Sequence, residues 1–272
     1  VKVAGRDGDV TPAAVVSGID WVIEHAAELD IRVISLALDT GYAGPYGSDP
    51  LAAAVERAWD AGIVVVTAAG NEGAESGGLN LPASDPHVIA VGGVRAIEGA
   101  FEVPDWASAG DGVRNPDLAA PGAHIQSLRV PGSDADLYHP EGHVENELLF
   151  KGSGSSQAAG VVAGGAALLL QANPSLTPDQ VKAALVESAT PLTDAPAEQV
   201  GHGLVNLPSA VDADVTDARQ EWPAATATRP LPQPAAVAVN PYWAGASWAG
   251  ASWAGASWAG ASWAGASWAG AS

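Results

Sequence analysis

The chain has 272 residues, of which 47% are hydrophobic and 15% charged, with no cysteine and a formal net charge of -20 from 31 acidic and 11 basic residues. A chain of this size and composition can bury a large core, which excludes disorder over most of its length. The negative charge argues against nucleic acid and membrane surfaces as partners, and the missing cysteines exclude disulfides, thiolate catalysis and cysteine-bound metals. No apolar run reaches the roughly 18 residues that a membrane helix needs.

The first hundred residues alternate predicted helices with short apolar runs. A capping threonine and a proline at 11–12 begin a helix that ends near residue 29, and a second helix covers 50–61. The apolar runs at 32–38, 63–69 and 88–94 predict buried strands. This alternation predicts an α/β fold with a doubly wound, mainly parallel sheet and helices on both faces, in which chemistry gathers at the carboxyl ends of the strands.

The second half predicts a buried helix over 161–171, a helix opening at Thr177 with capping-box spacing, and a turn at 201–203. The globular pattern fades after residue 212. We therefore predict a domain over 1–212, an Ala/Pro-rich linker over 213–241 and a low-complexity tail over 242–272.

The tail repeats the pentad WAGAS six times from Trp243. A period of five matches neither the strand period of two nor the helical period of 3.6, so we expect no regular structure from the tail alone. The alternative is an aromatic array that contacts polysaccharide, cell wall or another copy of the chain.

Six blocks, in order, carry a resemblance to a known family: VISLAL, DAGIVVVTAAGNEG, LPASDPHVIAVGGV, DLAAPGAHIQSL, GSSQAAGVVAGGAALLL and GHGLVNLPSAV. Over residues 1–212 the chain resembles the C-terminal part of the catalytic domain of the subtilisin-like serine proteases, or subtilases. The resemblance implies a secreted serine endopeptidase that hydrolyses peptide bonds of protein or peptide substrates through an acyl-enzyme.

The resemblance places the nucleophile at Ser156 and an oxyanion-hole donor at Asn71. The residues agree with this, because a glycine-rich helix start lets substrate approach and offers unpaired N–H groups where negative charge develops. Taken alone, Ser156 would be read as a helix-capping hydroxyl and Asn71 as part of an ordinary turn.

The resemblance also implies that substrate lies as an added strand between two backbone segments. Asp39 stands where the family usually has glycine; its carboxylate would exclude acidic side chains or recruit basic ones, or it is a solvated loop acid. The implied substrate-binding residues are Ala37, Leu38, Asp39, Ala68, Ala69, Gly70, Asn80, Leu81, Pro82 and Ala83.

Subtilases activate their serine with a histidine oriented by an aspartate, in segments that precede those matched here. The chain begins Val-Lys-Val and has no methionine, which we interpret as a fragment or processed product whose base and acid lie upstream. We therefore expect this chain alone to be inactive, with one sheet edge and some core exposed. None of its six histidines has the family setting. A solvated role is predicted for His25 in a surface helix, for His87 and His124 in connecting turns, and for His202 in a glycine-rich turn.

The resemblance implies stabilising calcium, although it assigns no metal ligands, and catalysis requires no cofactor. His139 and His143, in an acidic loop near 132–147, are a weak signal for a metal. A propeptide or protein inhibitor is a further implied partner. The alternative function is a degenerate, noncatalytic subtilase scaffold that binds or adheres through its tail. A nucleotide-binding enzyme is disfavoured because no GxGxxG or GxxxxGK[ST] follows a predicted strand.

Overall fold

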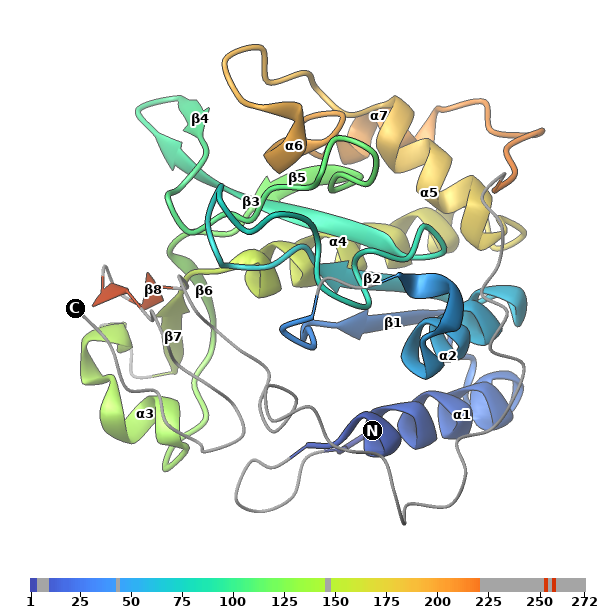
Figure 1. Ribbon diagram of the computed structural model, residues 1–272, viewed down its shortest axis with the longest axis horizontal. Helices are drawn as coiled ribbons and strands as arrows, with labels where there is room; N and C mark the ends of the chain where they lie inside the picture. Colours follow the sequence, from blue (N-terminus) through green and yellow to red (C-terminus); the bar gives the residue numbers. More distant parts are fainter. Residues whose placement is uncertain (4–9, 43–44, 145–147, 221–251, 254–255, 258–272) are drawn as a thin grey trace.

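The computed structural model describes residues 1–3, 10–42, 45–144, 148–220, 252–253 and 256–257. Its centre is a five-stranded sheet with helices on both sides (Figure 1). Strand β3 pairs in parallel with β2 and β5 and antiparallel with β4, and β2 pairs in parallel with β1. The strands are β1 (Val33–Leu36), β2 (Val64–Ala68), β3 (Ile89–Ile97), β4 (Ala100–Glu102) and β5 (Leu118–Pro121).

The helices begin where the sequence supplies caps. Thr11 caps α1, Asp49 caps α2, and Thr177 opens α5 with a capping box completed by Gln180. The α-helices are α1 (Pro12–Leu29), α2 (Pro50–Asp60), α3 (Asp134–Tyr138), α4 (Ser155–Ala172), α5 (Pro178–Glu187), α6 (Ala197–Val200) and α7 (Leu207–Val211).

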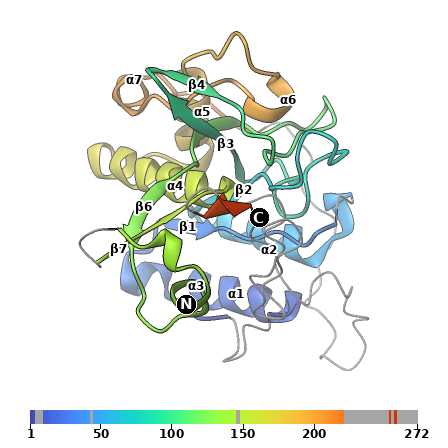
Figure 2. The same ribbon diagram turned by 90° about the vertical axis from the view of Figure 1, so that its left-hand side faces the viewer.

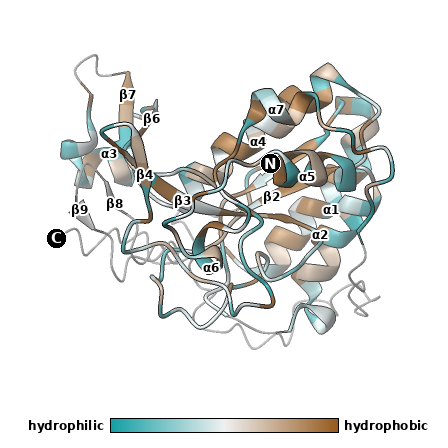
Figure 3. Cartoon of the chain, turned by 90° about the horizontal axis from the view of Figure 1, so that it is seen from above, coloured by the Kyte–Doolittle hydropathy of each residue, from teal (hydrophilic) through white to brown (hydrophobic). Residues whose placement is uncertain are grey.

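The hydrophobic core lies between the sheet and its helices. Figure 2 shows α4 on one side of β1 and β2 and α2 on the other. Every residue of β2 is buried, and the strands of the sheet and much of α4 are hydrophobic in Figure 3. Burying such Val, Leu and Ile side chains contributes about 1.5–3 kcal/mol each, so this layer supplies the main stabilisation of the fold.

The predicted α/β architecture is confirmed, with three differences in detail. Helix α4 starts at Ser155 instead of 161, because the small residues of its first turn pack tightly against the sheet. The strands β6 (Ile125–Leu128) and β7 (Leu149–Gly152) form an antiparallel pair that the sequence did not predict. The acidic loop contains α3 and the short 3₁₀ turn η2 (Pro140–Gly142), and a second 3₁₀ turn, η1 (Tyr46–Ser48), precedes α2.

The packed chain continues past residue 212. Val215 is 7% exposed in the main core, and Gln220 Nε2 donates to the carbonyl of Pro86 at 2.7 Å. Residues 213–220 of the predicted linker thus lie against the globular part. The rest of the linker and most of the predicted tail fall outside the described residues; within the tail, β8 (Ser252–Trp253) pairs antiparallel with β9 (Ala256–Ser257).

One edge of β1 has no strand beside it in the part of the chain that the structure describes. A cavity of about 430 Å³ lies next to it, lined by apolar side chains of α1 and β1 that include Val15, Ile19, Val33 and Leu36. None of the helices built from described residues is long and apolar enough to cross a membrane.

Candidate active site

The sheet and α4 bring three chain segments to one edge. Strands β1 and β2 are parallel, with Leu36 opposite Thr67, so the residues that follow them emerge side by side. Helix α4 contacts both strands and begins at the same edge. The sequence therefore places the segments 37–39, 69–71 and 154–156 together because the strands share a direction and the helix starts where they end.

Ser156 lies in the first turn of α4 and is half-buried, whereas its neighbour Ser155 is completely buried. The Ser156 hydroxyl lies 3.5 Å from the carbonyl oxygen of Ala37. Gly154, just before the helix, has a backbone φ of 152°, which residues other than glycine rarely adopt. Of the two serines, Ser156 is thus the one with a solvent-accessible side chain.

Asn71 is held by the other serine. Its Oδ1 accepts hydrogen bonds from the backbone N–H of Ser155 at 2.8 Å and from the Ser155 hydroxyl at 3.0 Å. Gly70 N–H in turn donates to Ser155 Oγ at 3.2 Å. Because the amide oxygen is engaged twice, the Asn71 Nδ2 group is left as the donor that faces away from Ser155.

The predicted pocket segments are also joined to one another. Thr40 N–H donates to the Leu81 carbonyl at 2.9 Å, and Leu81 N–H donates to the Tyr42 carbonyl at 3.0 Å. Asn80 Nδ2 donates to Asp39 Oδ1 at 3.3 Å. The predicted residues Leu81, Pro82 and Ala83 are buried, and the Leu81–Pro82 peptide is cis. Ala68, Ala69 and Gly70 are also buried.

Asp39 is buried, so its interpretation as a solvated loop acid is wrong. It is 4% exposed, and its Oδ1 accepts from Gly41 N–H at 2.6 Å as well as from Asn80. Burial, followed by the negative charge of Glu72, raises the pKa of Asp39 to about 8. Burial also raises the pKa of Glu72, against the opposing effect of a hydrogen bond from Ser108.

These two acids form no ion pair with a described residue. Glu72 Oε1 is buried and has no hydrogen-bond partner in the part of the chain described. The segments that follow β1 and β2 thus carry two carboxyl groups that lack an ion-pair partner among the described residues.

Among the described residues, no histidine forms a hydrogen bond with Ser156. The Ser156 hydroxyl donates to the carbonyl oxygen of Ala37 instead. His25, His124 and His202 lie on the helix and turns predicted for them. The solvated role predicted for His87 is wrong, because His87 is 8% exposed. His139 of the acidic loop is also buried, at 3% exposed. His139 pairs with Glu141 at 3.0 Å and His143 with Asp136 at 2.8 Å, so the two histidines of the acidic loop bind different acids.

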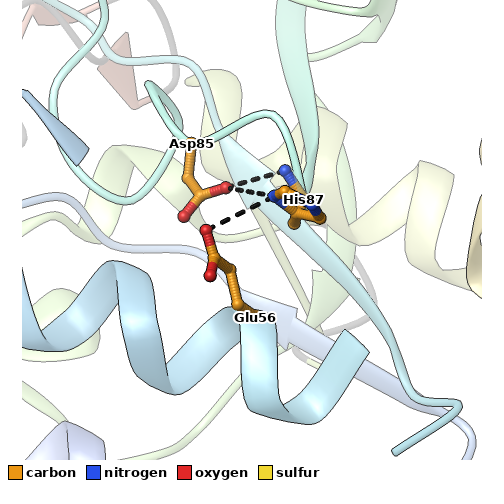
Figure 4. A group of neighbouring side chains, drawn as sticks. All are labelled: Glu56, Asp85 and His87. Atoms are coloured by element: carbon orange, nitrogen blue, oxygen red, sulfur yellow. Dashed lines mark hydrogen bonds and ion pairs between the residues drawn. The ribbon is translucent and has the colours of Figure 1, made fainter. Parts of the chain in front are cut away.

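The described residues gather one group of three side chains with metal-ligand chemistry: Glu56, Asp85 and His87 (Figure 4). Calcium takes six to eight oxygen ligands, and an imidazole nitrogen with two carboxylates does not fit that requirement. This group therefore does not supply the expected calcium site.

Sequence reasoning missed two features of this region. It gave no role to Ser155, although a second hydroxyl beside Ser156 was a signal for a supporting contact. It also missed Glu56, a charged residue that directly follows the apolar run LAAAV of α2 and is buried.

Comparison with known proteins agrees with this geometry. The model of the Subtilase family matches residues 1–203. The chain is 37% identical over 223 residues to the serine protease AprX of Bacillus subtilis (strain 168), covering 78% of this chain and 50% of that protein. It is 34% identical over 212 residues to subtilisin E of the same organism, covering 77% and 48%. The chain thus spans about half the length of the curated relatives it matches.

Solved structures agree on the fold. The crystal structure of fervidolysin from Fervidobacterium pennivorans, described as a keratinolytic enzyme related to subtilisin, matches with a TM-score of 0.61 and 30% identity, covering 76% of this chain and 30% of that one. Sphericase shares the fold with a TM-score of 0.60 at 22% identity, covering 72% and 64%. The fold is subtilisin-like, and the chain belongs to the subtilase family.

Proposed function

We propose that this chain contributes the nucleophile, the oxyanion hole and most of the substrate cleft of a secreted serine endopeptidase. The observation that carries the proposal is the arrangement of Ser156 and Asn71, which the buried Ser155 links at the start of α4. Relatives of the chain include proteins named as serine proteases and subtilisins.

The proposed reaction begins when Ser156 Oγ attacks the carbonyl carbon of the scissile peptide bond and gives its proton to a base. The carbonyl oxygen becomes negatively charged and accepts hydrogen bonds from Asn71 Nδ2 and from the backbone N–H of Ser156. The base returns the proton to the leaving amine, which departs and leaves an acyl-enzyme. Water then releases the acid product by the same steps.

The base and its orienting acid are proposed to be a histidine and an aspartate from chain outside these 272 residues. All six histidines lie in the described part of the chain, and none of them forms a hydrogen bond with Ser156 there. A serine hydroxyl is a weak nucleophile without such a base, so the segment that carries it is required for turnover.

The substrate is proposed to lie between Ala37–Asp39 and Ala68–Gly70, with its side chain before the scissile bond directed to the wall 80–83. The unpaired carboxyls of Asp39 and Glu72 favour a basic side chain there. Above about pH 8, where the Asp39 carboxyl is ionised, Asp39→Asn should lower kcat/KM for an arginine substrate relative to a leucine substrate, because an attracting negative charge is lost. Since the pKa of Asp39 is about 8, the arginine preference of the wild type should increase as the pH rises through that value.

Hydrolysis of a series of peptides that differ only in this side chain tests the proposal. The protein in its full natural length should hydrolyse them with a burst of acylation, and Ser156→Ala should abolish turnover, while Ser155→Ala keeps part of it. Full turnover by Ser156→Ala would contradict the nucleophile assignment. An arginine preference that Asp39→Asn leaves unchanged would contradict only the assignment of the pocket.

A further inference from the structure

A buried group of three side chains joins α2 to the loop before β3 (Figure 4). Glu56 projects from α2, and Asp85 and His87 belong to the loop that follows the pocket wall 80–83. Glu56 is 6% exposed, Asp85 is 0% exposed and His87 is 8% exposed. Three ionisable groups so far from solvent need compensating partners.

The separations within this group resemble those between ligands of one metal ion. His87 Nδ1 lies 3.3 Å from Asp85 Oδ1 and 3.4 Å from Glu56 Oε1. A charge-assisted hydrogen bond between such groups is about 2.7–2.9 Å long. Two ligands of a tetrahedral zinc ion, each about 2.0–2.2 Å from the metal, are about 3.4 Å apart. The spacing matches that of two ligands of one ion, and it is long for the direct hydrogen bond that His87 Nδ1 and Asp85 Oδ1 make without one.

Asp85 gives an independent indication. Its Oδ1 accepts a hydrogen bond from the backbone N–H of His87 at 2.7 Å, which fixes the carboxylate beside the imidazole. Its Oδ2 is buried and has no hydrogen-bond partner in the described part of the chain. A buried carboxylate oxygen without a partner is unfavourable, and a bound cation removes that penalty.

We propose that Glu56, Asp85 and His87 bind one divalent transition-metal ion of the zinc type. An imidazole with two carboxylates is a ligand set that zinc accepts, and the two carboxylate charges balance the charge of the ion. A water molecule would take the fourth ligand position, as in zinc sites with three protein ligands.

The site would fix the pocket wall to the body of the domain. Lys182 Nζ donates to the carbonyls of Pro86 and Val88 at 2.8 Å each, and Arg114 donates to the carbonyl of Asp85 at 3.1 Å. The loop is thus anchored through its carbonyls, while the side chains of Asp85 and His87 turn toward Glu56 (Figure 4). A metal ion at this point would add the link to α2, a few residues after the wall ends.

Zinc binding to the protein in its full natural length, purified without an affinity tag and stripped with a chelator, tests this proposal independently of the proposed activity. Titration with zinc chloride, followed by calorimetry and metal analysis after dialysis, should give one bound ion per chain and a melting temperature that rises until one equivalent is added. Calcium chloride should not compete for the site.

The variants Glu56→Gln, Asp85→Asn and His87→Ala should each weaken zinc binding by more than the roughly 10- to 100-fold typical of outer-shell partners. The two amide variants keep the shape of the side chains, so they serve if His87→Ala fails to fold. His143→Ala is the matched control, because His143 pairs with Asp136 in a separate group and its loss should leave zinc binding unchanged. The proposal is wrong if the wild type retains no zinc, or if His143→Ala lowers binding while the three ligand variants do not.

Discussion

At the start of α4, two neighbouring serines occupy different surroundings. Ser155 is buried against Asn71, and Ser156 is partly exposed beside Ala37. In the proposed mechanism only the second hydroxyl reacts, and the first orients the amide that stabilises the oxyanion. This division gives each serine a distinct kinetic signature.

Asn71→Ala should lower kcat by about a hundred- to a thousand-fold with little change in KM, the range found when a subtilisin loses its oxyanion-hole asparagine. Ser155→Ala should lower kcat by a smaller factor, because it removes one of the two hydrogen bonds that orient the amide. Steady-state kinetics on one peptide checks both values. Equal KM increases with unchanged kcat would show that these residues bind substrate instead.

Asp39 makes the stability of the chain depend on pH. Its pKa in the folded state is about 8, above the ordinary value of 3.8, so the native state keeps a proton that the unfolded chain releases. The stabilisation is complete below about pH 4 and is lost as the pH rises to about 8, with a slope of at most about 1.4 kcal/mol per pH unit.

Asp39→Asn keeps an oxygen acceptor for Gly41 and Asn80 but does not titrate. The variant should therefore melt at a higher temperature than the wild type at pH 8, and the difference should shrink toward pH 4. Melting curves across this range check the expectation, with Asp60→Asn at the exposed end of α2 as control. A difference that is constant with pH would mean that Asp39 titrates normally.

Among the elements, α5 depends on a complete capping box. Thr177 Oγ1 accepts from Gln180 N–H at 3.3 Å, and Gln180 Oε1 accepts from Thr177 N–H at 3.0 Å. Thr177→Ala should reduce the free energy of unfolding by about 1 kcal/mol, since such caps contribute about 0.5–2 kcal/mol. Chemical denaturation measures this loss of unfolding free energy. Ser175→Ala should cause a smaller loss, because the Ser175 hydroxyl donates to Asn173 outside the helix.

The same elements show what sequence can and cannot predict. Helices with caps, such as those at Thr11 and Thr177, and the apolar strands of the sheet were predicted near their observed bounds because their signals are local. The strands β4 to β7 have only three or four residues each, lie outside the predicted apolar runs and were missed.

Contacts between residues far apart in the sequence could not be predicted from hydrophobic patterns and motifs. Ser155 and Asn71 are 84 residues apart in the sequence, and their hydrogen bond depends on how α4 packs against β2. Glu56 and His87 meet only because α2 packs beside the loop before β3. Such pairs depend on tertiary packing, which a residue pattern constrains only to the level of element and face.

For the whole molecule, the sheet, α4 and the cleft form one body that presents Ser156 without a base of its own among the described residues. The unpaired edge of β1 and the apolar cavity beside it lie on the side of Ala37, next to the proposed nucleophile. The central claim is therefore that Ser156 is the nucleophile of a catalytic unit that further chain completes.

Labelling by a fluorophosphonate probe tests this claim most directly. The protein in its full natural length should be labelled, Ser155→Ala should keep the label and Ser156→Ala should lose it. The 272-residue chain alone should not be labelled, because the base is proposed to lie outside it. Labelling that survives Ser156→Ala, or a folded full-length protein that never labels, would contradict the account.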